Sequence, residues 1–222
     1  MNNNLTEMIF ILDMSGSMSS LKDDTIGGYN SLIAEQKKQP GDANITTVLF
    51  DNRYILLHDR INIKEVKELT SKDYMPCGMT AMLDAIGRTV VAIGQKLADT
   101  PEENRPGNVV VTIITDGFEN ASKEYTWSII KNMIKEQRDK YNWTFTFIGA
   151  NIDVDKVSED LGIDSRFAKK YTASKAGTNT VYDAVAKSVS FTRKVSAKRS
   201  SVTSKMSEEE MLEMSSILDD IQ

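Results

Sequence analysis

Strand-length apolar runs alternate with longer, helix-like segments along most of this 222-residue chain. The strands expected at 7–13 and 108–117 have apolar interiors, β-branched in the second, without the polar alternation of a half-exposed strand. Such strands are covered on both faces, as in a parallel sheet between two layers of helices. The sequence therefore predicts an α/β fold with a doubly wound, mostly parallel sheet and helices on both faces. Six strands are expected, at 7–13, 44–51, 53–59, 108–117, 143–151 and 166–173.

The segments between these strands have apolar residues at helical spacing. They predict helices at 20–39, 64–70, 81–99, 124–140, 154–162 and 178–195. The second and third strands are separated by a residue or two around Asn52, which predicts a hairpin. The pair Gly27-Gly28 inside the first helix is costly for a helix and predicts close packing against a neighbour.

The composition changes near residue 194, which divides the chain into a predicted domain at 1–193 and a tail at 194–222. The tail is rich in Ser, Lys and Glu and has no core-forming pattern at its start, so flexibility is expected there. Its end predicts a short amphipathic helix. Ser207 and Glu210 have capping-box spacing, and four apolar residues share one helical face: Met211, Met214, Leu218 and Ile221. This helix can dock on its own domain, on a second copy or on a partner, and the first is favoured.

Charge and cysteine content exclude several classes of function. The net charge is -5 and the basic residues are dispersed, so nucleic-acid binding is not expected. No apolar run approaches the roughly 20 residues that a membrane-spanning helix needs. The single cysteine, Cys77, cannot form an intrachain disulfide, and the first residues have no signal-peptide pattern. A cytoplasmic protein is expected.

Oxygen-bearing side chains follow two of the apolar strands. Asp13 ends the first strand and is followed by Ser15 and Ser17, while Asp116 ends the strand at 108–117. In a doubly wound sheet, ligands bind beyond the carboxyl ends of the strands, and the loop before the helix at 81–99 offers Thr80 there. Two carboxylates and three hydroxyls suit a hard divalent cation, Mg²⁺ or Mn²⁺, better than Zn²⁺ or Cu²⁺. Such a cation would keep a coordination position for a carboxylate from outside.

The same residues carry a resemblance to a known family. The stretches "DMSGS" at 13–17, "GMTAMLDAI" at 78–86 and "IITDG" at 113–117 resemble the three metal-site loops of the von Willebrand factor A (vWA) domain. The resemblance implies a Rossmann-like fold with sheet order 3-2-1-4-5-6 and one antiparallel edge strand. It also implies a metal-ion-dependent adhesion site (MIDAS). Its ligands would be Asp13, Ser15, Ser17, Thr80 and Asp116. More narrowly, the chain is similar to small, free-standing bacterial vWA proteins.

Three functions stay open at this point. The leading hypothesis is an intracellular module that binds an Asp or Glu side chain of a partner protein through the cation. A Mg²⁺-dependent phosphatase-like enzyme is the second, although Ser15 stands where such enzymes have their second aspartate. The third is an assembly protein that self-associates through its C-terminal helix. Asp84 can support a metal-site loop or cap its helix, and Cys77 lacks a convincing histidine partner in His58.

Overall fold

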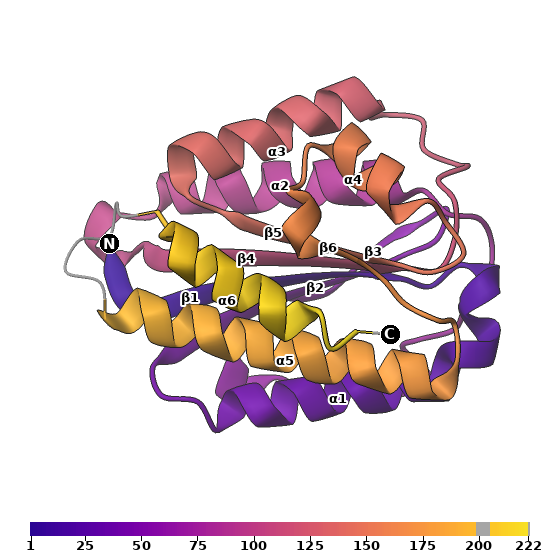
Figure 1. Cartoon of the computed structure of the whole chain (residues 1–222), viewed down its shortest axis with the longest axis horizontal. Helices are drawn as coiled ribbons and strands as arrows, with labels where there is room; N and C mark the ends of the chain where they lie inside the picture. Colours follow the sequence, from indigo (N-terminus) through magenta and orange to yellow (C-terminus); the bar gives the residue numbers. More distant parts are fainter. Residues whose placement is uncertain (199–204, 222) are drawn as a thin grey trace.

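The structure, a computed structural model, describes residues 1–198 and 205–221 and has a six-stranded sheet at its centre (Figure 1). The strand order is β3-β2-β1-β4-β5-β6, as predicted. Neighbouring strands are parallel except for the hairpin of β2 and β3 at one edge. The strands are β1 (Asn2–Asp13), β2 (Asp42–Phe50), β3 (Tyr54–Asn62), β4 (Pro106–Thr115), β5 (Thr144–Gly149) and β6 (Ala168–Lys170).

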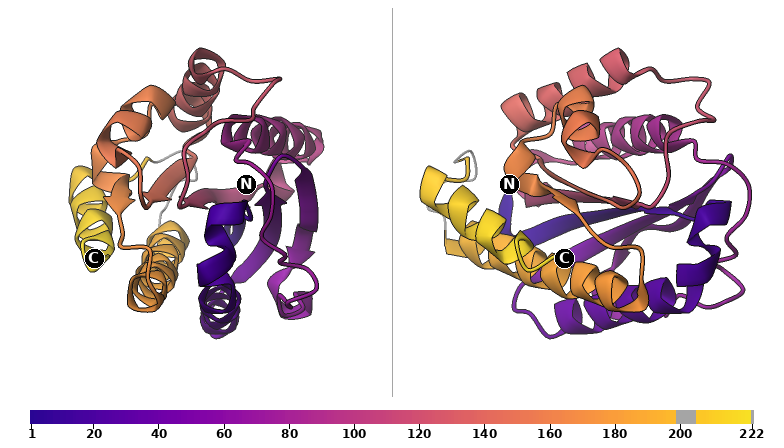
Figure 2. Two further views of the ribbon diagram at one scale, coloured as in Figure 1. Left: turned by 90° about the vertical axis from the view of Figure 1, so that its right-hand side faces the viewer. Right: turned by 45° about the vertical axis from the view of Figure 1, so that its right-hand side comes forward.

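Helices cover both faces of the sheet, so the predicted doubly wound α/β fold is confirmed. The views in Figures 1 and 2 place α2, α3 and α4 over one face and α1 and α5 over the other, with α6 near the β6 edge. Their bounds are α1 (Lys22–Lys37), α2 (Met82–Asp99), α3 (Trp127–Tyr141), α4 (Val154–Leu161), α5 (Lys175–Lys198) and α6 (Glu208–Leu218). Among the described residues, none of the helices is both long enough and apolar enough to cross a membrane.

The prediction of a helix at 64–70 is wrong. Only a 3-10 turn forms, at Ile63–Glu65, and the chain continues in an extended conformation at Val66. The side chain of Asn30 on α1 accepts a hydrogen bond from the Leu69 backbone N–H and donates one to the Leu69 carbonyl. Because Val66 and Leu69 are also buried, tertiary contacts with α1 replace the hydrogen bonds that a local helix would have made.

Close packing of α1 against α5 explains one of the two adjacent glycines in α1. A Cβ atom on Gly28 would lie 2.2 Å from the ring of Tyr182, whereas one on Gly27 would meet nothing within 4 Å. Near the C-terminal ends of α1 and α5, the buried Arg193 donates hydrogen bonds to the carbonyls of Gln36, Pro40 and Gly41. Arg193 thereby ties α5 to the end of α1 and to the turn that follows it.

The C-terminal helix α6 docks on its own domain, the favoured alternative. Its N-terminus has the predicted capping box of Ser207 and Glu210, and Met214, Leu218 and Ile221 are buried. Three ion pairs also join it to the domain: Arg166–Glu208, Lys169–Asp219 and Lys187–Asp220. The boundary predicted at residue 193 falls within α5, so the division into domain and tail stays a prediction. The flexibility expected at 199–204 lies outside the described residues.

Candidate metal site

The predicted site residues lie in three loops at one edge of the sheet. Strands β1 and β4 are adjacent and parallel, with Leu12 opposite Ile114, so both send their chains out at the same edge. Asp13 and Asp116 follow at that edge, and the loop before α2 brings Thr80 beside them. The structure therefore brings together all five predicted residues from segments that are far apart in the sequence.

Hydrogen bonds join the two carboxylates to the serines. The Ser15 and Ser17 hydroxyl oxygens are 3.0 Å apart, and Ser17 donates to Asp116 Oδ1 at 2.5 Å. Asp13 accepts the Ser15 backbone N–H at Oδ1 (2.7 Å) and the Thr115 hydroxyl at Oδ2 (2.5 Å). Asp13 and Ser15 are buried, whereas Ser17 is exposed, so the cluster opens to solvent on the Ser17 side.

Gly117 shows how closely the hydroxyls and carboxylates converge. A Cβ atom added to it would lie 3.1 Å from Thr80 Oγ1, 3.3 Å from Ser17 Oγ and 3.9 Å from Asp13 Oδ2. Oxygens from all three loops thus surround one small space, which a side chain at position 117 would crowd.

Backbone contacts fix the position of the Thr80 loop. Asn120 accepts the Thr80 N–H through its side chain (2.9 Å) and donates its own N–H to the Thr80 carbonyl (3.0 Å). The Gly16 N–H donates to the Gly78 carbonyl at 3.1 Å, which ties this loop to the loop after β1. Gly78 has a φ of +71°, in the left-handed region that favours glycine.

Several supporting residues were not predicted from the sequence. Tyr74, which is fully buried, donates its hydroxyl hydrogen to the Asp13 carbonyl at 2.5 Å. Thr115 binds Asp13, as described above, and Asn120 binds Thr80. Thr115 has a weak sequence signal because it directly precedes Asp116, but nothing in the sequence marks Tyr74 or Asn120 as a neighbour of these loops.

Asp84 supports the loop that follows β4. Its carboxylate accepts three backbone N–H groups, from Lys123, Glu124 and Tyr125, each at 2.9 Å. Burial alone would raise the pKa of Asp84, but these donors outweigh it and lower the pKa. Of the two roles left open by the sequence, loop support is the one observed.

The Cys77 N–H donates to the Met14 carbonyl (2.9 Å), but the side chains of Cys77 and His58 have partners outside the five predicted site residues. The Cys77 thiol lies beside the Asp51–Arg53 ion pair, with Arg53 Nη2 at 3.1 Å. His58 is buried next to Thr47 and Tyr29. Cys77 and His58 thus have different side-chain partners.

The electrostatics of the cluster favour a bound cation. Burial raises the pKa of Asp13 to about 6, and the nearby Asp116 charge adds to the rise, while hydrogen bonds from Thr115 and Ser15 oppose it. Burial also raises the pKa of Asp116, against the hydrogen bond from Ser17. Two partly desolvated carboxylates close to one another are costly, and a divalent cation would offset that cost.

The donor set fits a hard cation. The described residues hold no group of three or more His, Cys, Asp and Glu side chains able to bind a metal. The candidate site instead combines two carboxylates with three hydroxyl groups. Carboxylate and hydroxyl oxygens are donors that Mg²⁺ and Mn²⁺ accept readily. The five residues therefore fit a divalent cation that retains water or takes an external oxygen ligand.

Structural comparison identifies the fold. No protein-family model and no curated protein matches the sequence. Proximal thread matrix protein 1 from the mussel byssus, with a zinc-occupied MIDAS motif, matches at a TM-score of 0.58, 16% identity, 83% coverage of this chain and 46% of that chain. The chain has a vWA fold. Manganese-loaded Plasmodium vivax TRAP protein matches at a TM-score of 0.55 and 16% identity, with 81% of this chain and 72% of that chain covered. A von Willebrand factor type A structure from Catenulispora acidiphila matches at a TM-score of 0.51 and 11% identity, with 87% of this chain and 42% of that chain covered.

The mussel proteins are longer than this chain. In both structures of this mussel protein with a TM-score of 0.58, the match to this chain covers 46% of the other chain's length. At 14% and 16% identity these matches show the shared vWA fold, while the site described above rests on the residues of this chain.

Replacing Gly117 with alanine is expected to weaken Mn²⁺ binding at least about tenfold, because the new methyl group would crowd the space between Thr80 and Ser17. None of the five predicted ligand residues is replaced in this variant. The φ of Gly117 is outside the left-handed region, so the fold should tolerate alanine. The affinity is measured by calorimetric titration with MnCl₂. Gly27→Ala is the matched control, since its Cβ would meet nothing within 4 Å; equal affinity in both variants would contradict the placement of the site.

Proposed function

We propose that this chain is an intracellular protein-binding module that uses a divalent cation, Mg²⁺ or Mn²⁺, to bind an Asp or Glu side chain of a partner protein. The observation that carries the proposal is the convergence of three hydroxyls and two carboxylates around the space beside Gly117. Two solved structures with the same fold support the proposal because each is described with a bound divalent metal: one has a zinc-occupied MIDAS motif and the other is loaded with manganese.

In this proposal the residues of the chain have distinct tasks. Asp13 and Asp116 supply the negative charge, and Ser15, Ser17 and Thr80 supply neutral oxygen donors. The cation, when bound, supplies a positive charge and a coordination position for the partner's carboxylate. Thr115 and Tyr74 hold Asp13 in place through its side chain and its carbonyl. Asn120 does the same for Thr80.

Exposed apolar side chains border these loops and would contact the partner. Phe118 follows Asp116 by two residues and is 63% exposed, and Met79, directly before Thr80, is 55% exposed. Met75, in the same loop, is 53% exposed, and its N–H points at the Met14 sulfur. Large apolar groups at the edge of a polar site are typical of an interaction surface. We propose that the partner's acidic residue is flanked by apolar residues.

Affinity capture from a lysate of the source organism tests this proposal. A partner should be retained by the wild type in Mg²⁺, and lost in EDTA and with Asp13→Asn. Phe118→Ser should weaken retention of the same partner and leave Mn²⁺ affinity unchanged, because Phe118 supplies no metal ligand. Retention that survives both EDTA and Asp13→Asn would contradict the proposal.

We propose binding rather than catalysis at this site. The residue two positions after Asp13 is Ser15, which is a poor general acid. No Mg²⁺-dependent turnover of p-nitrophenyl phosphate is expected. Turnover that Asp13→Asn abolishes would instead favour the phosphatase-like alternative.

Self-association through α6 has less support, because the chain itself covers the apolar face of that helix.

A further inference from the structure

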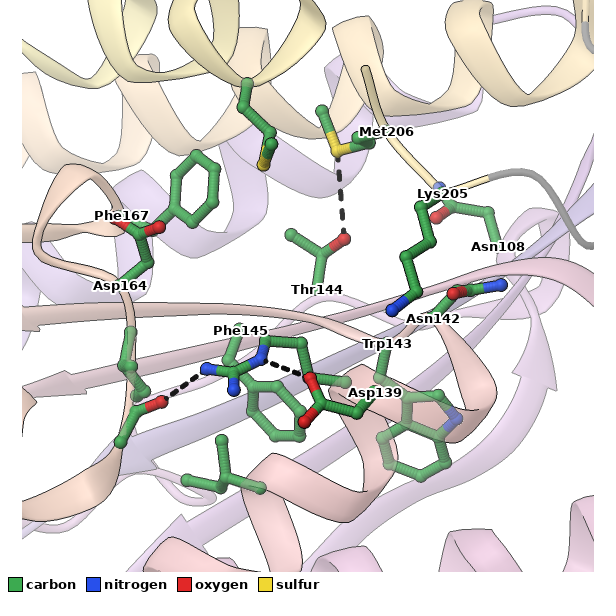
Figure 3. A pocket seen from close by; sticks show the side chains of 15 residues that line it. Asn108, Asp139, Asn142, Trp143, Thr144, Phe145, Asp164, Phe167, Lys205 and Met206 are labelled. Carbon is green, nitrogen blue, oxygen red and sulfur yellow. Dashed lines mark hydrogen bonds and ion pairs between the residues drawn. The ribbon is translucent and has the colours of Figure 1, made fainter. Parts of the chain in front are cut away.

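A cavity of about 270 Å³ lies at the end of the sheet opposite to the metal site (Figure 3). It is lined by Asn108 near the start of β4 and by Thr144 at the start of β5, whereas the metal site follows the carboxyl ends of β1 and β4. The segment that enters α6 forms another wall through Lys205 and Met206. The proposed protein-binding function uses none of these residues.

Most of the cavity wall is apolar. Trp143 and Phe145 lie with their rings nearly parallel, at an angle of 25° and with 6.1 Å between the centroids. Phe167 lines the side formed by the 3-10 turn at Ser165–Phe167, and Met206 lies on the side of α6 (Figure 3). The Met206 sulfur contacts the Thr144 hydroxyl at 3.9 Å. These walls suit an apolar body of limited size.

One polar group in this wall is buried without a partner. Asn108 is only 8% exposed, and its Nδ2 has no hydrogen-bond partner among the described residues. A buried donor of this kind is rare, because leaving it unpaired costs free energy. Since Asn108 lines the cavity, a hydrogen-bond acceptor inside the cavity would satisfy its Nδ2.

The charges around the cavity favour an acceptor that is negative. Arg138 is already bound to Asp139 (3.0 Å) and to the Gly162 carbonyl (2.9 Å), and Asp164 pairs with Arg166 (2.7 Å). Lys205 extends its ammonium group into the cavity (Figure 3). Arg138 thus pairs with Asp139, Arg166 is shared between Asp164 and Glu208, and the ammonium group of Lys205 is the cation that points into the cavity.

We propose that this cavity binds a small monocarboxylate with an apolar body. The apolar body lies against Trp143 and Phe145. The carboxylate accepts a hydrogen bond from Asn108 Nδ2 and pairs with the ammonium group of Lys205. The apolar walls, the unpaired donor and the cation each match one part of such a molecule.

Titration with octanoate tests the assignment in the full chain. The protein has two tryptophans, so Trp127→Phe leaves Trp143 in the cavity wall as the only tryptophan, which can be excited selectively at about 295 nm. In this background, octanoate should change the Trp143 fluorescence saturably. 1-Octanol and octylamine have the same chain without the negative charge and should bind at least about tenfold more weakly, because a hydrogen bond to a charged group is stronger than one to a neutral group.

Two variants separate the contacts. Lys205→Glu should weaken octanoate binding at least about tenfold. Lys72→Glu replaces an exposed lysine that does not line the cavity and should leave the octanoate affinity unchanged. Asn108→Leu, which removes the unpaired donor, should weaken octanoate binding without lowering the melting temperature. No saturable change at millimolar octanoate, equal binding of 1-octanol, or equal effects of the two lysine variants would overturn the proposal.

Discussion

Asp13→Asn is expected to lower the affinity for Mn²⁺ at least about a hundredfold, because even residues that only orient a metal's ligands typically cost 10–100-fold when changed. Asparagine keeps the shape of the side chain and an oxygen that can accept the Ser15 N–H. It removes one of the two negative charges that the site offers. Electron paramagnetic resonance of free Mn²⁺ measures the affinity directly.

The same variant should remain folded without metal. Burial raises the pKa of Asp13 to about 6, so at neutral pH the metal-free protein holds an ionised carboxylate in an unfavourable environment. Removing that charge should leave the melting temperature in EDTA unchanged or raise it. Added Mn²⁺ should stabilise the wild type and not the variant. Equal stabilisation of both proteins by Mn²⁺ would place the cation elsewhere.

Leu218→Ala is expected to lower the free energy of unfolding by about 2–5 kcal/mol, the usual cost of removing a buried leucine side chain. Leu218 is fully buried and lies on the face of α6 that packs against the rest of the chain. If α6 is an integral part of the domain, the cavity left behind destabilises the whole fold. Urea unfolding followed by circular dichroism measures the change.

Leu212→Ala is the matched control within the same helix. Leu212 is 55% exposed, so its truncation should change the free energy of unfolding by no more than about 0.5 kcal/mol. Similar small effects of both substitutions would mean that α6 contributes little to the stability of the domain. That result would also weaken the cavity proposal, because the segment entering α6 forms one of its walls.

The doubly wound α/β fold and the position of the two aspartates at strand ends could be predicted from local patterns, whereas the strand order was implied by the resemblance to vWA domains. Continuous apolar runs mark buried parallel strands, and Asp13 and Asp116 stand where such strands end. The helix predicted at 64–70 failed because its apolar residues serve an extended segment held by Asn30. Periodicity over seven residues cannot distinguish these two cases.

Contacts between segments far apart in the chain could not be predicted from the sequence. Tyr74 and Asn120 support the site through hydrogen bonds to backbone groups, which impose no recognisable spacing on the sequence. The unpaired amide of Asn108 appears only when β4, β5 and the segment entering α6 are assembled. Such features depend on the tertiary fold as a whole.

A crystal structure with Mn²⁺, phased on the anomalous signal of the metal, tests the central claim most directly. We expect one strong anomalous peak between the Asp13 and Asp116 carboxylates, within coordination distance of the Ser15, Ser17 or Thr80 hydroxyls. The peak should vanish in crystals of Asp13→Asn. A fully occupied Mn²⁺ site elsewhere, with no peak beside Gly117, would contradict the assignment of these residues as the metal site.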